Sequence, residues 1–143
     1  MRAGLEQAVP FNQHLGLQVA ELSVGRGVVV LPDTESLRNP VGSQHAGALF
    51  AAGHAASGAA FVAAFVEDLD AVAPHAESAE ISYKKIPRGP ITATAVLGAT
   101  PQELHEELER DGSVGFAIDV SLTDGAGDVV ADMTVRWTIS RED

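Results

Sequence analysis

The sequence contains no cysteine among its 143 residues, and it has few basic residues. Without cysteine, disulfide bonds, thiolate nucleophiles and thiolate metal sites are all excluded. Nine Lys and Arg stand against twenty Asp and Glu, which gives a formal net charge of −11. Because binding to nucleic acid needs a basic face that neutralises phosphates, we expect no nucleic-acid partner.

Signals for secretion and for metal binding are also missing from the sequence. The first sixteen residues, MRAGLEQAVPFNQHLG, contain no apolar run, so we predict no signal peptide and a cytoplasmic location. His14, His75 and His105 lie in separate segments without metal-ligand spacing, so no metal site is expected. The length suits one domain with its own core, and we predict a single domain over residues 1–143.

The most prominent feature that is present is an apolar stretch inside residues 39–66. Residues 46–66 contain no Asp, Glu, Lys or Arg. The length would allow a membrane span, but Ala and Gly contribute little insertion energy and the flanks lack a Lys/Arg asymmetry. We therefore expect no membrane span and predict a central helix buried on all sides, closed by Glu67, Asp68 and Pro74.

Polar residues within and before this helix mark a candidate site. Phe50, His54, Ser57 and Phe61 fall on one stripe at helical spacing. A buried His and Ser need partners or a function, because burying polar groups costs free energy. The preceding loop is rich in turn residues, and a helix start offers free N–H groups to developing negative charge.

The segments around the helix show the alternation and the β-branched residues of strands. We predict six strands, at residues 15–23, 27–31, 76–86, 91–98, 113–123 and 128–139. Residues 1–14 are expected to form a short helix or arm with Leu5, Val9 and Phe11 facing inward. The acidic residues 101–110 are expected to form a surface helix or a solvated excursion.

This order predicts an α+β fold, because one helix must be shared by six strands. A single helix cannot cover both faces of such a sheet. We therefore expect an antiparallel sheet of about six strands curled round one long central helix. The rest of the sheet is expected to be covered by a second subunit in a homo-oligomer, either a dimer or a tetramer.

An Asn-x5-His-x-Gly segment that enters a small-residue helix, in this element order, resembles the hotdog fold. More narrowly, it resembles the acyl-CoA thioesterases related to the phenylacetate-pathway and 4-hydroxybenzoyl-CoA enzymes. In that family the segment commonly reads N-x5-H-G-G, and an Asp or Glu follows the His by nine residues. Asn39 and His45 have this spacing, Ala46 replaces the first Gly, and Gly47 is the second. His54 stands where the family has its carboxylate.

The resemblance implies a role for each of these residues. The N–H of Ala46 would polarise the thioester carbonyl, and Asn39 would orient the water or hold the carbonyl. His54 would replace the carboxylate as general base, with Ser57 at a position that often assists it. His45 and Gly47 would lie beside the substrate. Turn chemistry for Asn39, a helix cap for His45 and a hydrogen-bonded core histidine for His54 are the structural alternatives.

The resemblance also suggests where the two parts of the substrate lie. The acyl group would enter beside Phe50 and Phe61. Lys84, Lys85 and Arg88 are three of the nine basic residues, and they would meet the phosphates of coenzyme A unless they only solubilise a strand end. Coenzyme A is part of the substrate, so no separate cofactor is expected.

The predicted function is hydrolysis of acyl-CoA thioesters to free acid and CoA at a site between subunits. The main alternative is a non-catalytic protein that binds acyl-CoA or another small ligand and has lost the catalytic carboxylate. A hotdog dehydratase or hydratase is a weaker third possibility, since those enzymes use a histidine.

Overall fold

The computed structural model describes residues 2–65 and 70–142, without the side chains of residues 2, 3 and 5. Two short helices come first, α1 (Arg2–Ala8) and α2 (Pro10–Leu15), and the long helix is α3 (Ala46–Val62). Two 3-10 turns, η1 (Glu35–Leu37) and η2 (Ala63–Phe65), flank it, and α4 (Pro101–Asp111) follows later. The strands are β1 (Gln18–Ser23), β2 (Arg26–Leu31), β3 (Val72–Tyr83), β4 (Ile91–Leu97), β5 (Ser113–Thr123) and β6 (Val129–Arg141).

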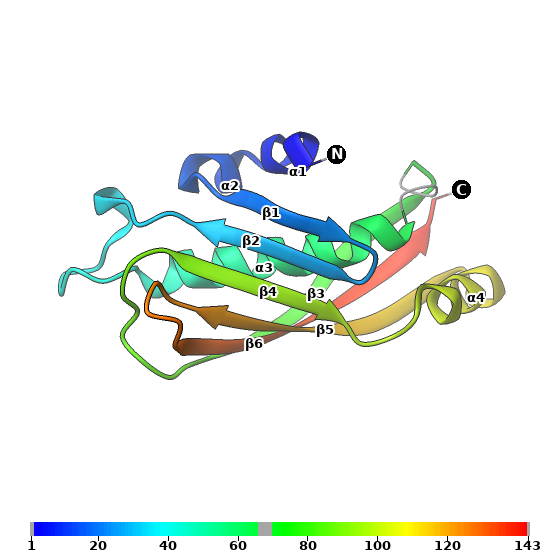
Figure 1. The fold of residues 1–143 in the computed structure, drawn as a ribbon. Coiled ribbons are helices and arrows are strands. Elements are labelled where there is room, and N and C mark those ends of the chain that lie inside the picture. The colour runs from blue at the N-terminus through cyan, green and yellow to red at the C-terminus, as the bar shows by residue number, and fades with distance from the viewer. Residues whose placement is uncertain (1, 66–69, 143) are drawn as a thin grey trace.

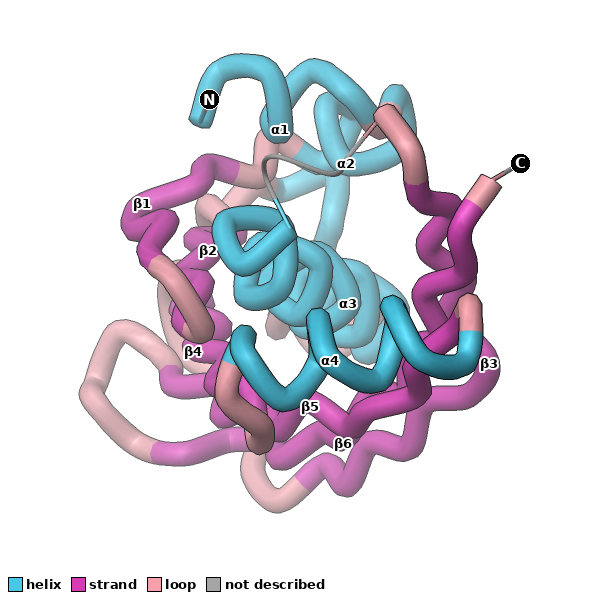
Figure 2. The backbone as a smooth tube through the Cα atoms, turned by 90° about the vertical axis from the view of Figure 1, so that its right-hand side faces the viewer, coloured by secondary structure: helices cyan, strands magenta, loops and turns pink. Residues whose placement is uncertain are grey.

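The six strands form one antiparallel sheet in the order β1-β2-β4-β5-β6-β3. The sheet curls round α3, which runs along its inner face (Figure 1). A view close to the axis of α3 shows strands on three sides of it and α1 and α2 over the fourth (Figure 2). This is the hotdog fold, and the predicted α+β class and six-stranded sheet are confirmed.

The inner face of the sheet is apolar because side chains alternate along each strand. In β5 the inward residues are buried, and the residues between them point outward. Gly27 in β2 permits an especially close approach to α3. A Cβ at this position would lie 2.7 Å from the Ala56 carbonyl oxygen and 2.8 Å from the Ala60 nitrogen. The sheet therefore touches the helix backbone directly, and small residues along α3 make that contact possible.

Residues 46–65 are long and apolar enough to cross a membrane. However, 67% of the most apolar window of this segment is buried inside the molecule. A core helix of a soluble protein has these properties, because it is surrounded by its own sheet. The prediction of a buried central helix is confirmed.

Two expectations about packing and helix ends are corrected by the structure. Val9 and Phe11 were predicted to face inward, but their side chains are 45% and 60% exposed. The reason is that α1 and α2 lie over the open side of the fold and turn one face to solvent. The structure does not describe the side chain of Leu5, so the prediction for that residue is outside the described part of the chain. Pro74 does not close the helix, since it pairs with Ile139 inside β3. The expected closing residues Glu67 and Asp68 also lie outside the described residues.

The acidic segment forms a helix, which decides between the two alternatives for residues 101–110. Thr100 caps α4, with its Oγ1 accepting a hydrogen bond from the Glu103 N–H. Leu104 and Leu108 are buried, while the acidic side chains face solvent. The i, i+4 spacing of the two leucines is therefore the apolar stripe of an amphipathic surface helix.

Candidate functional site

Asn39 organises the loop that leads into α3. Its Oδ1 accepts hydrogen bonds from the N–H groups of Val41 and Ser43, at 3.1 and 3.0 Å. Its Nδ2 donates to the Ser43 Oγ at 2.8 Å. These contacts are the turn chemistry expected of an Asn-Pro pair. They leave one Nδ2–H of Asn39 without an acceptor among the described residues.

The start of α3 presents one free backbone donor. His45 is the N-cap, and its Nδ1 accepts a hydrogen bond from the Gly47 N–H at 2.8 Å. This is the helix-cap alternative for His45, and it occupies the Gly47 donor. The Ala46 N–H has no acceptor in the part of the chain that the structure describes, and Ala46 is exposed. A ligand oxygen can therefore reach this N–H at the positive end of the helix dipole.

A hollow of about 340 Å³ surrounds this helix start, and Asn39, Ala46, Lys84 and Lys85 all line it. Tyr83, at the end of β3, also lines it and donates its hydroxyl to the Ala46 carbonyl oxygen at 2.9 Å. Burial raises the pKa of Tyr83, so its hydroxyl stays protonated. Sequence reasoning missed Tyr83, because its partner lies 37 positions away.

The two lysines in this hollow form only solvent-exposed ion pairs. Lys84 Nζ lies 3.0 Å from the Asp132 carboxylate, and Lys85 Nζ lies 3.5 Å from that of Asp128. Exposed ion pairs of this kind contribute little stability, so an incoming phosphate can compete for the lysines. Arg88 does not line the hollow. Its backbone N–H donates to the Asp124 carboxylate, which fixes the loop and not the guanidinium.

Gln44 also lines the hollow and was not singled out from the sequence. Its Nε2 donates to the Pro32 carbonyl oxygen at 3.0 Å, but its buried Oε1 has no hydrogen-bond partner among the described residues. The single bond ties the loop to the end of β2. Gln44 therefore helps to hold the loop that carries Asn39.

His54 lies elsewhere, in the wall of a cavity of about 140 Å³ between α3 and the N-terminal segment. Glu6, Val19, Val29, Gly58 and Trp137 are among the other residues that line it. The imidazole is half-buried, 5.3 Å from the Trp137 ring between centroids, and no described residue hydrogen-bonds to it. Burial lowers the pKa of His54 below its ordinary value, which keeps the ring neutral at neutral pH.

Ser57 and Phe61 pack against the same tryptophan. Ser57 is fully buried; its Oγ donates to the His54 carbonyl oxygen at 2.7 Å and accepts from the Trp137 Nε1 at 2.9 Å. Phe61 is buried edge-on against Phe116 and Trp137, and Phe50 is half-buried. Three residues of the predicted stripe, His54, Ser57 and Phe61, therefore contact Trp137, which sequence reasoning did not connect with them.

The structure thus places the predicted residues in two separate groups. Ala46 and His54 are eight residues apart, or roughly 12 Å along a helix. The hollow at Ala46 and the cavity at His54 share no lining residue. Within one chain, the free N–H and the imidazole do not face a common space. No group of His, Asp and Glu that could hold a metal ion is found among the described residues.

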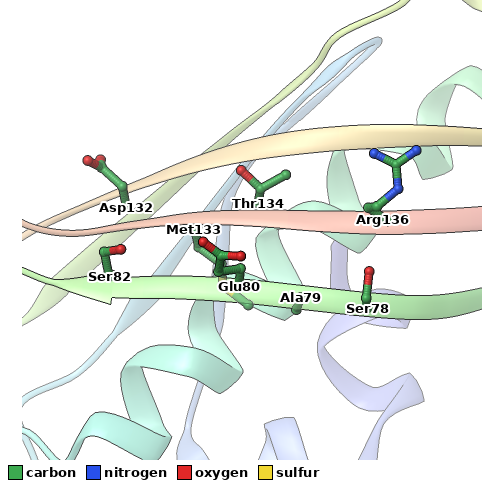
Figure 3. Close-up of a pocket in the computed structure, with 8 residues that line it drawn as sticks. All are labelled: Ser78, Ala79, Glu80, Ser82, Asp132, Met133, Thr134 and Arg136. Carbon is green, nitrogen blue, oxygen red and sulfur yellow. The ribbon is translucent and has the colours of Figure 1, made fainter.

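A third hollow, of about 460 Å³, crosses the outer face of β3 and β6. Glu80 and Ser82 on β3 and Asp132, Thr134 and Arg136 on β6 line it (Figure 3). It contains none of the predicted site residues. Because polar side chains line this hollow, water can form hydrogen bonds with this part of the outer sheet face.

Comparison with known proteins identifies the family of the chain. Residues 1–139 match the family described as a domain of unknown function, DUF4442. The chain belongs to the DUF4442 family. Among curated proteins, none matches this DUF4442 protein.

Solved structures share the fold of the DUF4442 protein, and three of them are described as thioesterases or as a probable thioesterase. A protein of unknown function from Pseudomonas aeruginosa, described as a probable thioesterase, is 27% identical with a TM-score of 0.88, over 99% of this chain and 93% of that chain. A thioesterase family protein from Silicibacter pomeroyi shares 17% identity with a TM-score of 0.77, over 99% and 100% of the two chains. A mutant of a thioesterase enzyme from Staphylococcus aureus shares 19% identity with a TM-score of 0.75, over 92% and 99%.

Proposed function

We propose that this DUF4442 protein hydrolyses acyl-CoA thioesters to free acid and CoA at a site shared by two subunits. The observation that carries the proposal is the free Ala46 N–H at the start of α3, in one hollow with Lys84 and Lys85. Attack on a thioester places negative charge on the carbonyl oxygen, and a fixed N–H aimed at that oxygen stabilises it. The lysines supply positive charge for the phosphates of CoA.

The general base in this proposal is His54 of the partner subunit, since the two groups do not meet within one chain. Neutral His54 accepts a proton from the water that attacks the thioester carbon. The resulting oxyanion is bound by the Ala46 N–H and by the remaining Nδ2–H of Asn39. The carbon–sulfur bond then breaks, and the leaving thiolate takes the proton back from the imidazolium of His54.

Apolar residues at the rim of the Ala46 hollow fit the arm of coenzyme A. Val41 is 77% exposed and Ile86 is 70% exposed, and both line the hollow. Large apolar side chains exposed together commonly mark a binding surface. In this arrangement the arm crosses Val41 and Ile86, and the phosphates reach the lysines at the end of β3.

Substitution of Ala46 by proline tests the carrying observation directly. Ala46 is the first residue of α3, where proline is favoured, and His45 already has the extended backbone that precedes proline (φ −64°, ψ 139°). Ala46→Pro therefore removes the N–H with little change to the backbone, and we expect kcat to fall by about 10²–10³. Ala46→Gly keeps the N–H and is the control. Equal activity in both variants, with the fold intact by circular dichroism, would exclude the oxyanion role.

The lysines are tested by comparing two kinds of substrate. Replacing Lys84 and Lys85 by Ala should raise KM for CoA esters by about tenfold, because each lost charged contact weakens binding. The same variant should leave N-acetylcysteamine thioesters unaffected, since these lack phosphates. Arg110→Ala, which removes an exposed basic residue from α4, is the matched control. Equal effects on both substrates would mean that the lysines act on folding.

A non-catalytic acyl-CoA binding protein is the second candidate. It is favoured by two observations. The single hydroxyl proton of Ser57 is already donated to the His54 carbonyl oxygen, and no group in the described chain hydrogen-bonds to the His54 imidazole to orient it. Calorimetry with a non-hydrolysable acyl-CoA ether, together with a turnover assay, separates the candidates. Binding without turnover supports the second one.

A further inference from the structure

The cavity beside His54 is lined by residues from both ends of the chain. The N-terminal segment contributes Val9 and Asn12, β2 contributes Val29, and α3 contributes His54 and Gly58. Most of the lining is apolar. The Glu6 carboxylate, which also lines the cavity, accepts a hydrogen bond from the Val19 N–H at 2.8 Å. The cavity is therefore a mostly apolar space whose polar lining side chains are Glu6, Asn12 and the neutral His54.

Gly58 keeps this space open without a steric need to be glycine. A Cβ at Gly58 would meet only the Cζ2 atom of Trp137, at 4.0 Å, which is an ordinary contact distance. By contrast, a Cβ at Gly27 would lie 2.7 Å from backbone. Glycine inside a helix is less stable than alanine. Packing against the rest of the chain does not explain Gly58, whereas an occupant of the cavity would.

We propose that this cavity binds the apolar end of the acyl group, with the reacting carbonyl toward His54 and the chain running toward Gly58. The inference rests on the proposed function and assigns the acyl group to the cavity under α1 and α2. Phe61, expected to line the acyl site, is instead packed behind Trp137.

The volume limits the size of the group. An apolar cavity of about 150 Å³ takes up one benzene molecule, and the cavity here has about 140 Å³. It suits a phenyl ring or an aliphatic chain of roughly six carbons. His54 precedes Gly58 by about one helical turn, so both lie on one face of α3. A chain attached to a carbonyl at His54 would therefore run along that face.

Trp137 provides the readout, because it is the only tryptophan of the chain and it lines the cavity. We would titrate the protein with 1-hexanol, a neutral probe that the Glu6 carboxylate does not repel, and follow tryptophan fluorescence. The wild type should show a saturable change. Gly58→Leu should weaken binding at least about tenfold, since its side chain fills the space. Gly4→Leu, in α1 with nothing within 4 Å of the added Cβ, should bind like the wild type.

If Gly58→Leu does not fold, Gly58→Ala provides the same test with a smaller side chain. It should melt no lower than the wild type and bind hexanol several-fold more weakly. A change that does not saturate in the wild type, or hexanol affinity that is the same in wild type and in every folded Gly58 variant, would overturn the proposal.

Hydrolysis of acetyl and hexanoyl thioesters separates this proposal from the proposed function. Wild type should prefer hexanoyl, and Gly58→Leu should shift the preference toward acetyl by tenfold or more. Saturable hexanol binding that depends on Gly58, without any turnover, would support the cavity and refute the hydrolase. Turnover with an unchanged preference in Gly58→Leu would refute the acyl assignment and leave the hydrolase standing.

Discussion

His54 is kept neutral by its position in the apolar wall of the cavity. Burial lowers its pKa, and the one carboxylate that lines the same cavity, Glu6, is already bound to the Val19 N–H. A neutral imidazole can accept a proton, as a general base must. The neutral imidazole of His54 is therefore in the protonation state that the proposed general-base role requires.

The pH profile of turnover tests this role. Activity should rise with pH through an apparent pKa below 6.5 and then level off, because only neutral His54 accepts a proton. His54→Ala should lower kcat by about 10²–10⁴, the range for a lost general base. Steady-state rates from pH 5 to 9 measure both effects. Full activity in His54→Ala would mean that the chemistry is done elsewhere.

His54 should also make stability depend on pH. Its pKa is lower in the folded chain than in the unfolded chain, so the unfolded chain binds the proton first as the pH falls. The free energy of unfolding should therefore decrease as the pH falls below about 6.5, the unfolded value, and stop decreasing below the folded pKa. Urea unfolding of wild type and His54→Gln measures this. The other histidines contribute equally to both, so an identical pH dependence would contradict the prediction.

Ser57 contributes to stability through Trp137. Ser57→Ala would leave the buried indole N–H without an acceptor, and we expect a loss of about 1–3 kcal/mol in the free energy of unfolding. In the double variant with Trp137→Phe that donor is also gone, so the combined loss should be smaller than the sum of the single losses. Urea denaturation of the four proteins gives this coupling. Strict additivity would show that the hydrogen bond does not matter.

At the scale of elements, the fold depends on how closely β2 approaches α3. The helix is rich in Ala and Gly, and Gly27 lets the strand lie directly on its backbone. Backbone atoms cannot move aside as the end of a flexible side chain can. The contact between these two elements is therefore more sensitive to an added methyl group than the cavity at Gly58.

Two matched substitutions test this difference. Gly27→Ala should lower the free energy of unfolding by about 1–3 kcal/mol, because its Cβ overlaps the Ala56 carbonyl. Gly58→Ala should raise it by about 0.5–1 kcal/mol through helix propensity. Urea or thermal unfolding measures both. Similar values for the two variants would mean that the close approach at Gly27 is relaxed by a shift of the strand.

At the scale of the whole molecule, the reason to expect an oligomer has changed. The sequence argument required a second subunit to cover the outer sheet face. That face carries polar residues such as Asp132, Thr134 and Arg136, which water can solvate (Figure 3). The expectation now rests on the unpaired edge of β3 and on the separation of Ala46 from His54 within one chain.

Light scattering at micromolar concentration should give at least a dimer, and a monomer would refute the shared site. Mixing two inactive variants is a sharper test. Ala46→Pro retains His54, and His54→Ala retains the Ala46 N–H. Because a two-fold dimer has two equivalent sites, mixed dimers restore one site each, and about a quarter of wild-type activity should return. No recovery after subunit exchange would mean that each site is built from one chain.

The sequence by itself determined the elements of this protein and the candidate residues at the start of α3. The alternation in residues 113–123 matched β5 at both ends, and the uncharged run after His45 matched α3. The turn chemistry of Asn39 and the cap at His45 were also readable. These features depend on residues within a few positions of one another, and local propensity and periodicity act over that range.

Only the tertiary structure decided which candidates share a site. Trp137 meets Ser57 across 80 positions, and Tyr83 meets Ala46 across 37. The curl of the sheet round α3 sets both contacts, and α1 and α2 contribute to the wall of the cavity at His54. No local pattern specifies these distances, because they depend on how the strands pack round the helix. The structure therefore separates Ala46 from His54 within one chain, which the spacing of the two residues did not show.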